Sequence, residues 1–151
     1  MKKEQIKKII AVAVSAIMAM GMLTSCGAGG SSKNADGKTV ITVGDWPQKE
    51  GTDKNNREEA KAKFETANTD VEIKPDAWTF DLQSFYAKAA GGKLPTVYKT
   101  NFTEASQIID SGYSADITAA LEKYGLADKF NNDILNLLSN DGKIYAFPYA
   151  V

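Results

Sequence analysis

The sequence contains no histidine and only one cysteine among its 151 residues. Without histidine the chain cannot build Ser-His-Asp or Cys-His nucleophile systems, histidine-based zinc sites, or ordinary histidine acid–base catalysis. A single cysteine excludes an internal disulfide framework and any CxxC pair. These absences point away from the common hydrolytic, redox and zinc-dependent enzymes.

An excess of charge of either sign is also missing, because 18 basic residues face 19 acidic ones. Residues 1–25 hold four of the basic and one of the acidic residues, so residues 26–151 carry a net charge of −4. A mildly acidic surface disfavours nucleic acid as a main partner. The sequence has neither GxGxxG nor a P-loop pattern. Asp53, Asn55 and Arg57 begin like a calcium loop but lack its turn glycine and final acid. We expect no cofactor and no metal.

The amino-terminal residues have the pattern of an export signal. Four lysines within residues 1–8 precede residues 9–23, which carry no charge. Fifteen residues at ~1.5 Å each span about 22 Å, which is short of the ~30 Å hydrocarbon core, so a permanent transmembrane helix is the weaker interpretation. We therefore expect residues 1–25 to be a signal peptide.

The signal ends in Leu23-Thr24-Ser25-Cys26, which resembles the bacterial lipobox. The resemblance implies that Cys26 is diacylated and becomes the first residue of a lipoprotein. Two acyl chains hold a protein at a membrane where one gives only marginal binding. Residues 26–37 are then the lipidated cysteine and a flexible Gly/Ser tether, and folding is expected to begin near Lys38. The alternative is a stray cysteine after an ordinary signal.

From Lys38 onward, short β-branched runs alternate with helical patterns, which predicts the α/β class. Leu82, Phe85, Tyr86 and Ala89 form the best helical pattern, with Asp81 or Thr79 as its cap and glycines after it. After a polar stretch over residues 48–56, Ala60, Phe64 and Ala67 fall at i, i+4 and i+7 of an earlier predicted helix, with Glu58 and Glu59 in its first turn. Strands are predicted at 39–43, 71–74, 95–99 and 143–147, and further helices at 103–111, 118–124 and 132–139, with a turn at 140–142.

Seven segments in order resemble the N-terminal part of bacterial extracellular solute-binding proteins. They are the lipobox, the Gly/Ser tether, TVITVGDW, EEAKAKFETANTDVEIK, FYAKAAGGKLPTVY, IIDSGYSADIT and DGKIYAFPYAV. The chain is most similar to the carbohydrate-type receptors of ABC importers. The resemblance implies an incomplete N-terminal lobe of a type II periplasmic-binding-protein-like fold, spanning residues 38–151, from a longer protein with two lobes. Thr96 departs from the family, whose members often carry Asp there.

In an open α/β sheet, ligands bind beyond the carboxyl ends of the strands. This rule selects Asp45 and Trp46 after the first strand, Trp78 after the second, and Asn101 and Phe102 after the third, while the resemblance adds Tyr149. An aromatic ring and a carboxylate or amide suit the apolar face and hydroxyl rim of a sugar. The alternatives are that both tryptophans pack within the lobe, that Phe102 lies in the core, and that Asn101 caps a helix.

The resulting hypothesis is a monomeric, membrane-anchored receptor that closes two lobes around a sugar or oligosaccharide and presents it to ABC permease subunits without catalysing a reaction. It places the protein on the outer face of the cell membrane. One lobe supplies half of such a site, so weak or no ligand affinity is expected of this fragment. A standalone surface lipoprotein that binds a protein or the cell wall is the alternative. An enzyme is the weakest class, because no nucleophile, metal cluster or acid–base pair stands out.

Overall fold

The computed structural model describes residues 32–149. The predicted signal peptide, Cys26 and the first part of the tether lie outside the described residues, as do Ala150 and Val151. Within the described range the elements are β1 (Ser32–Lys33), β2 (Thr39–Val43), α2 (Thr52–Ala67), β3 (Val71–Pro75), α3 (Leu82–Ala90), η2 (Phe102–Glu104), α4 (Ala105–Asp110), α5 (Thr118–Lys123), η3 (Ala127–Lys129), α6 (Asn132–Leu137), β4 (Ser139–Asn140) and β5 (Lys143–Ile144).

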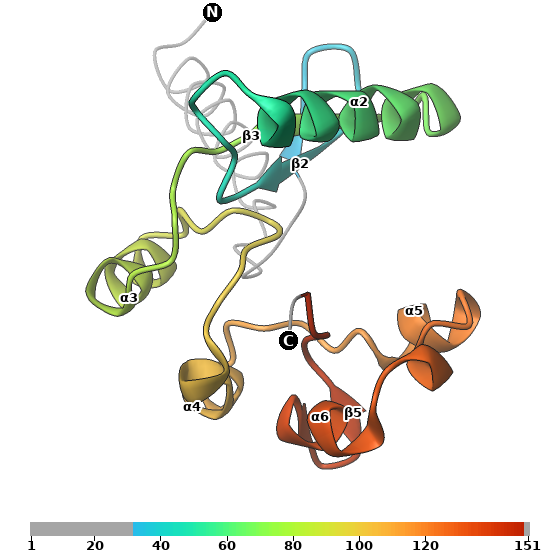
Figure 1. The fold of residues 1–151 in the computed structure, drawn as a ribbon. Helices are drawn as coiled ribbons and strands as arrows, with labels where there is room; N and C mark the ends of the chain where they lie inside the picture. Colours follow the sequence, from blue (N-terminus) through green and yellow to red (C-terminus); the bar gives the residue numbers. More distant parts are fainter. Residues whose placement is uncertain (1–31, 150–151) are drawn as a thin grey trace, which may run out of the picture. The chain divides into compact units, whose positions relative to one another are not determined.

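The first sheet has the strand order β1-β2-β3, and Figure 1 labels β2 and β3 of this sheet. β2 and β3 are parallel, with Thr39 opposite Val71 and Val43 opposite Pro75, and α2 connects them as a βαβ unit. Both strands agree with the sequence prediction, since β-branched side chains suit a strand packed between neighbours. β1 pairs antiparallel with β2 through Ser32 and Lys33. Regular structure therefore begins before Lys38, inside the segment predicted to be a flexible tether.

Helix α2 begins at Thr52, well before the predicted first turn at Glu58 and Glu59. The helix itself is present, but its apolar spacing does not mark a buried face, because no residue of α2 is buried and Phe64 is 43% exposed. Polar contacts hold the helix instead. Glu65 accepts a hydrogen bond at 2.7 Å from the backbone N–H of Ile73 in β3, and Lys61 forms an ion pair with Glu65. An apolar periodicity was therefore the wrong guide to this helix.

The predicted strand over residues 95–99 is reduced to a single parallel bridge between Val43 and Val97. Pro95 has no N–H to donate, and the threonine side chains replace much of the backbone pairing. The Thr96 N–H donates to Thr42 Oγ1 at 2.8 Å, and the Thr42 N–H donates to Thr96 Oγ1 at 3.2 Å. The segment thus follows the edge of β2 without forming a regular strand.

Helix α3 has the predicted boundaries and the predicted cap. The Asp81 side chain accepts a hydrogen bond from the Ser84 N–H at 2.9 Å, and Gly91 follows the last helical residue. Phe85 on this helix is completely buried. Five aromatic rings surround it at centroid distances of 5.2 to 6.5 Å, namely Trp78, Phe80, Tyr86, Tyr98 and Tyr113. This aromatic cluster is the core of the middle of the chain.

The carboxy-terminal part contains short helices and a β-hairpin whose two strands, β4 and β5, have two residues each. The predicted helices appear as α4, α5 and α6, and they bury Ile108, Leu121 and Leu135. Asp141 and Gly142 both have positive φ angles, 50° and 74°, as the tight turn between β4 and β5 requires. The predicted strand over 143–147 is shorter, since β5 ends at Ile144. In residues 32–149, no helix combines the length and apolar character needed to cross a membrane.

Candidate functional site

The loop that leaves β2 at Gly44 is fastened to the ends of two other segments. The Gly44 N–H donates to Val97 O at 2.8 Å, the Asp45 N–H to Trp78 O at 2.7 Å, and the Trp46 N–H to Asp76 O at 3.0 Å. A Cβ at Gly44 would lie 3.2 Å from Pro95 Cγ and 3.3 Å from Trp78 O, so glycine suits this crowded position. The loop therefore holds Asp45 in one place at the carboxyl edge of the sheet.

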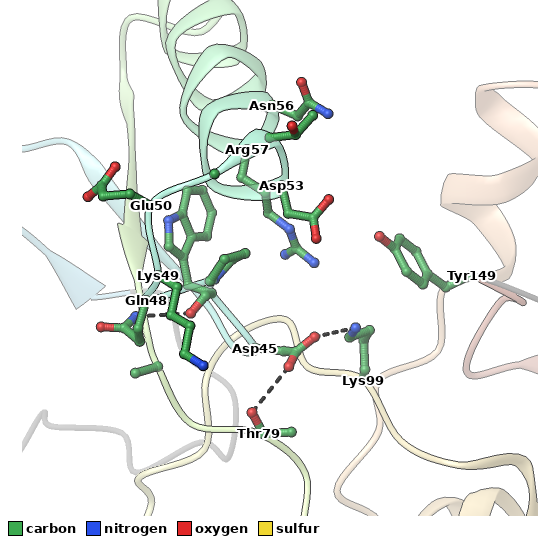
Figure 2. A pocket seen from close by; sticks show the side chains of 15 residues that line it. Asp45, Gln48, Lys49, Glu50, Asp53, Asn56, Arg57, Thr79, Lys99 and Tyr149 are labelled. Atoms are coloured by element: carbon green, nitrogen blue, oxygen red, sulfur yellow. Dashed lines mark hydrogen bonds and ion pairs between the residues drawn. The ribbon is translucent and has the colours of Figure 1, made fainter.

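Both carboxylate oxygens of Asp45 have partners. Oδ1 accepts a hydrogen bond from Thr79 Oγ1 at 3.1 Å, and Oδ2 forms an ion pair with Lys99 Nζ (Figure 2). Burial alone would raise the pKa of Asp45, but the hydrogen bond and charge of Lys99, helped by Thr79 and Arg57, lower the pKa below its ordinary value. Asp45 has a φ of 53°, a left-handed conformation that a non-glycine residue adopts uncommonly. The group is an ionised acceptor held by its neighbours.

Asp45 lies in a pocket of about 920 Å³ at this edge of the sheet. Lysine, arginine and amide donors alternate around it with carboxylate and hydroxyl acceptors, so the wall can both donate and accept hydrogen bonds. Figure 2 shows the pocket between the start of α2, the Asp45–Lys99 pair and Tyr149. Its lining consists of residues 45–53, Asn56 and Arg57 of α2, Ala77 and Thr79 after β3, and Lys99 and Tyr149.

A smaller pocket of about 230 Å³ adjoins it and shares Asp45, Thr79 and Lys99. Asn101 lines this smaller pocket. Its side chain makes no capping hydrogen bond to the helix that follows, so the alternative of Asn101 as a cap is wrong. Asn101 is therefore free to present its amide toward the Asp45–Lys99 pair.

The four aromatic residues predicted for the site lie in different environments. Tyr149 is 70% exposed and lines the large pocket, with Lys99 Nζ 5.0 Å from its ring centroid. Trp46 also belongs to the lining, but it is only 6% exposed. Trp78 stacks on Phe85 and donates from Nε1 to Ser84 Oγ at 3.2 Å, which confirms the alternative that it packs against the following helix. Phe102, predicted to bind the ligand, lines neither pocket, and at 42% exposed it does not fit the alternative of a core residue either.

Sequence reasoning missed three residues that the structure brings to Asp45, namely Thr79, Lys99 and Arg57. Lys99 is the last residue of the predicted third strand, and the rule was applied only to residues that follow a strand. Including the last residue of each strand would have selected it. Arg57 entered the sequence analysis only as part of an incomplete calcium-loop pattern, which gave it no role in a site. Among the described residues, no group of three or more Cys, Asp or Glu side chains is arranged to hold a metal ion.

The chain is similar in structure to two solved sugar-binding proteins. One is the galacto-N-biose/lacto-N-biose I-binding protein of the ABC transporter from Bifidobacterium longum in complex with lacto-N-biose, with a TM-score of 0.58 and 21% identity over 74% of this chain and 28% of that chain. The other is an ABC substrate-binding protein from Listeria monocytogenes in complex with cycloalternan, with a TM-score of 0.55 and 24% identity over 71% of this chain and 28% of that chain.

These matches define the class of fold. The described residues have an α/β fold of the kind found in ABC-transporter solute-binding proteins, and the chain spans about 28% of the length of each of the two solved proteins. No protein-family model matches the chain, and no curated protein matches it either. At 21–24% identity the likeness concerns the fold, so the role of each pocket residue rests on the geometry described above.

Proposed function

We propose that this chain is the solute-binding component, or part of one, of an ABC importer and that its pocket at the end of β2 takes a sugar or oligosaccharide. The observation that carries the proposal is the fixed Asp45 carboxylate, paired with Lys99 and Thr79 on the wall of a pocket of about 920 Å³. Both solved proteins of similar fold hold carbohydrate ligands, which supports the same class of ligand here.

The chemistry of the pocket suits a sugar. Each sugar hydroxyl both donates and accepts a hydrogen bond, and the ring carbons form an apolar face. The carboxylate of Asp45 can accept from a hydroxyl, while the ammonium of Lys99 and the amide of Asn101 can donate to one. The exposed Tyr149 ring can cover an apolar face. No group in this wall is arranged as a nucleophile with an adjacent base, so the proposed role is binding without chemical conversion.

The pocket is one wall of the proposed site. Proteins that share this fold bind by hinge closure of two lobes, and contacts from both lobes surround the ligand. A single wall buries only part of a ligand, whereas enclosed pockets bury most of its surface. We therefore propose that this chain alone binds weakly and that a second lobe supplies the remaining contacts.

The test is a titration of the full 151-residue chain with lacto-N-biose and with cycloalternan, monitored by nuclear magnetic resonance. We expect the backbone signals of Asp45, Thr79 and Lys99 to shift with glycan concentration. Asp45→Asn keeps the shape of the side chain and removes its charge, so it should weaken the response, whereas Lys63→Gln on the exposed face of α2 should not. Equal responses from Asp45→Asn and the unsubstituted chain would contradict the assignment of the pocket.

Membrane attachment through Cys26 is a separate proposal, based on the lipobox resemblance. A Cys26→Ser variant removes the thiol that would be diacylated. We expect the unsubstituted protein in the membrane fraction, on the outer face of the cell, with the added mass of a lipid. The variant should lack that mass, and it should either keep its signal peptide or be released in soluble form. Incorporation of labelled palmitate by both forms alike would contradict this anchor.

A further inference from the structure

Arg57 is the only arginine among the 18 basic residues of the chain. It lies in the second turn of α2 and lines the large pocket that also contains Asp45. Arginine differs from lysine in its planar guanidinium, which presents donors in a fixed fork and stacks on aromatic rings. In a chain that otherwise uses lysine, this position therefore brings a distinct chemistry to the pocket.

The ring of Trp46 is not open to a ligand. Trp46 is 6% exposed, and its Nε1 donates to Glu58 Oε1 at 3.1 Å, which fixes the orientation of the indole. The guanidinium carbon of Arg57 lies over the ring, 5.8 Å from the centroid. A sugar entering the pocket on this side meets the guanidinium before it can meet the indole, so the expected stacking of a sugar on Trp46 does not fit this geometry.

The donors of Arg57 remain available to a ligand. Among residues 32–149, no side chain or backbone oxygen accepts a hydrogen bond from its guanidinium, and no carboxylate forms an ion pair with it, whereas Lys99 is paired with Asp45. Figure 2 shows the side chain of Arg57 extending from α2 into the pocket. Stacking on a fixed indole restricts the side chain without using its donors, which lowers the entropy lost when a ligand binds.

We propose that Arg57 contacts the ligand and that Trp46 is a positioning residue that holds Arg57 in place. The guanidinium fork matches a ligand with two neighbouring acceptor oxygens, which are either vicinal hydroxyls of a neutral sugar or the carboxylate of a uronic acid. The inference rests on the proposed function, since it names a contact within the same pocket. It also changes the role assigned to Trp46 from stacking platform to support for Arg57.

The single arginine allows a direct test, because its Nε–H gives one signal in the arginine region of a ¹H–¹⁵N spectrum. The full chain is studied in a detergent without a sugar headgroup, first without ligand. We expect the ring current of Trp46 to displace the Arg57 Nε–H signal, with Trp46→Phe keeping part of this displacement and Trp46→Leu removing it. No change in Trp46→Leu, in a chain whose other signals show that it is folded, would overturn the positioning role.

Lacto-N-biose then serves as the neutral probe and digalacturonic acid as the acidic one. Binding of either should shift the Arg57 Nε–H signal. Arg57→Gln should weaken that binding by about tenfold or more, the scale of losing hydrogen bonds from a charged group. Arg57→Lys keeps the charge but loses the planar fork of donors, so its affinity should lie between that of the unsubstituted chain and that of Arg57→Gln. Lys63→Gln removes one positive charge from the exposed part of the same helix and should leave affinity within about twofold.

The outcomes separate the two proposals. Shifts at Asp45 and Lys99 with no change at Arg57, together with equal affinity in Arg57→Gln, would overturn the role of Arg57 and leave the proposed pocket intact. If neither probe shifts any pocket signal, the proposed function fails and the inference fails with it. A response to only the acidic probe assigns a carboxylate to the fork, and a response to the neutral probe assigns vicinal hydroxyls.

Discussion

Lys99 and Asp45 form an ion pair between two segments that are distant in the sequence, and this pair joins the loop after β2 to the segment that follows the Val43–Val97 bridge. The same ammonium group lies 5.0 Å from the ring centroid of Tyr149. One lysine therefore connects a carboxylate and an aromatic ring that both line the large pocket. If the pocket binds a ligand, the position of Lys99 decides where its acceptor and its ring are presented.

The Asp45–Lys99 ion pair should make the stability of the folded state depend on pH. The lowered pKa of Asp45 means that its carboxylate stabilises the folded state at pH values above its ordinary value of 3.8, and this contribution is lost as the pH falls through the lower pKa of the folded state. In Lys99→Gln the burial remains while the main lowering influence is removed, so the pKa of Asp45 should rise. The carboxyl carbon shift of Asp45, followed against pH, measures it. An unchanged midpoint would show that Lys99 does not control this group.

Gly44 should tolerate no side chain. An added Cβ would meet Pro95 Cγ at 3.2 Å and Trp78 O at 3.3 Å, and Trp78 O already accepts a hydrogen bond from Asp45. Because that oxygen cannot move without losing its partner, Gly44→Ala should lower the free energy of unfolding by about 1–3 kcal/mol. Urea denaturation measures the loss. Gly91→Ala is the matched control, since its nearest contact is 3.4 Å, and a loss as large there would refute the steric explanation.

The aromatic cluster should dominate the stability of the middle of the chain. Phe85 is completely buried, so Phe85→Ala should cost about 3–5 kcal/mol of unfolding free energy. Phe102 has the same side chain but is 42% exposed, and Phe102→Ala should cost less than about 1 kcal/mol by the same scaling with burial. Thermal and denaturant unfolding of the two variants are compared directly. Similar losses would place Phe102 in a core that the structure does not give it.

Two polar residues before helices should differ in the same way. Asp81 accepts a hydrogen bond from the Ser84 N–H, so Asp81→Ala should destabilise the protein by about 1 kcal/mol. Asn101 makes no such bond, and Asn101→Ala should change stability by less than about 0.5 kcal/mol. If Asn101→Ala proved as costly as Asp81→Ala, the amide would be a cap and its place in the proposed site would be lost.

Local chemistry explains which parts of the fold could be predicted. The β-branched run of β2 and the combination of cap, apolar periodicity and terminal glycine in α3 each depend on neighbouring residues, and both elements have the predicted bounds. Helix α2 depends on partners elsewhere in the chain, including the Ile73 N–H that donates to Glu65. A periodicity of apolar residues cannot report such a contact, so the start of α2 was placed too late.

In the candidate site, too, the features set by neighbouring residues could be predicted, and those set by distant partners could not. Asp45 could be predicted because the end of a strand marks the binding edge of an α/β sheet. Its partners could not, because the Thr79 hydroxyl and the Lys99 ammonium meet it only through the pairing of β2 with its neighbours. Trp46 was selected by the same rule, but its burial beneath Arg57 depends on the position of α2. The end of the strand thus identified the pocket region but not the role of each side chain.

Residue-resolved titration shows whether the pocket beside Asp45 takes a carbohydrate. The full ¹⁵N-labelled chain is titrated with lacto-N-biose up to about 10 mM, which reaches affinities near 1 mM, or about 4 kcal/mol of binding free energy. We expect saturable shifts confined to the residues around Asp45, Thr79, Lys99 and Arg57, and their loss in Asp45→Asn. Saturable shifts located on another surface, unaffected by Asp45→Asn, would contradict it.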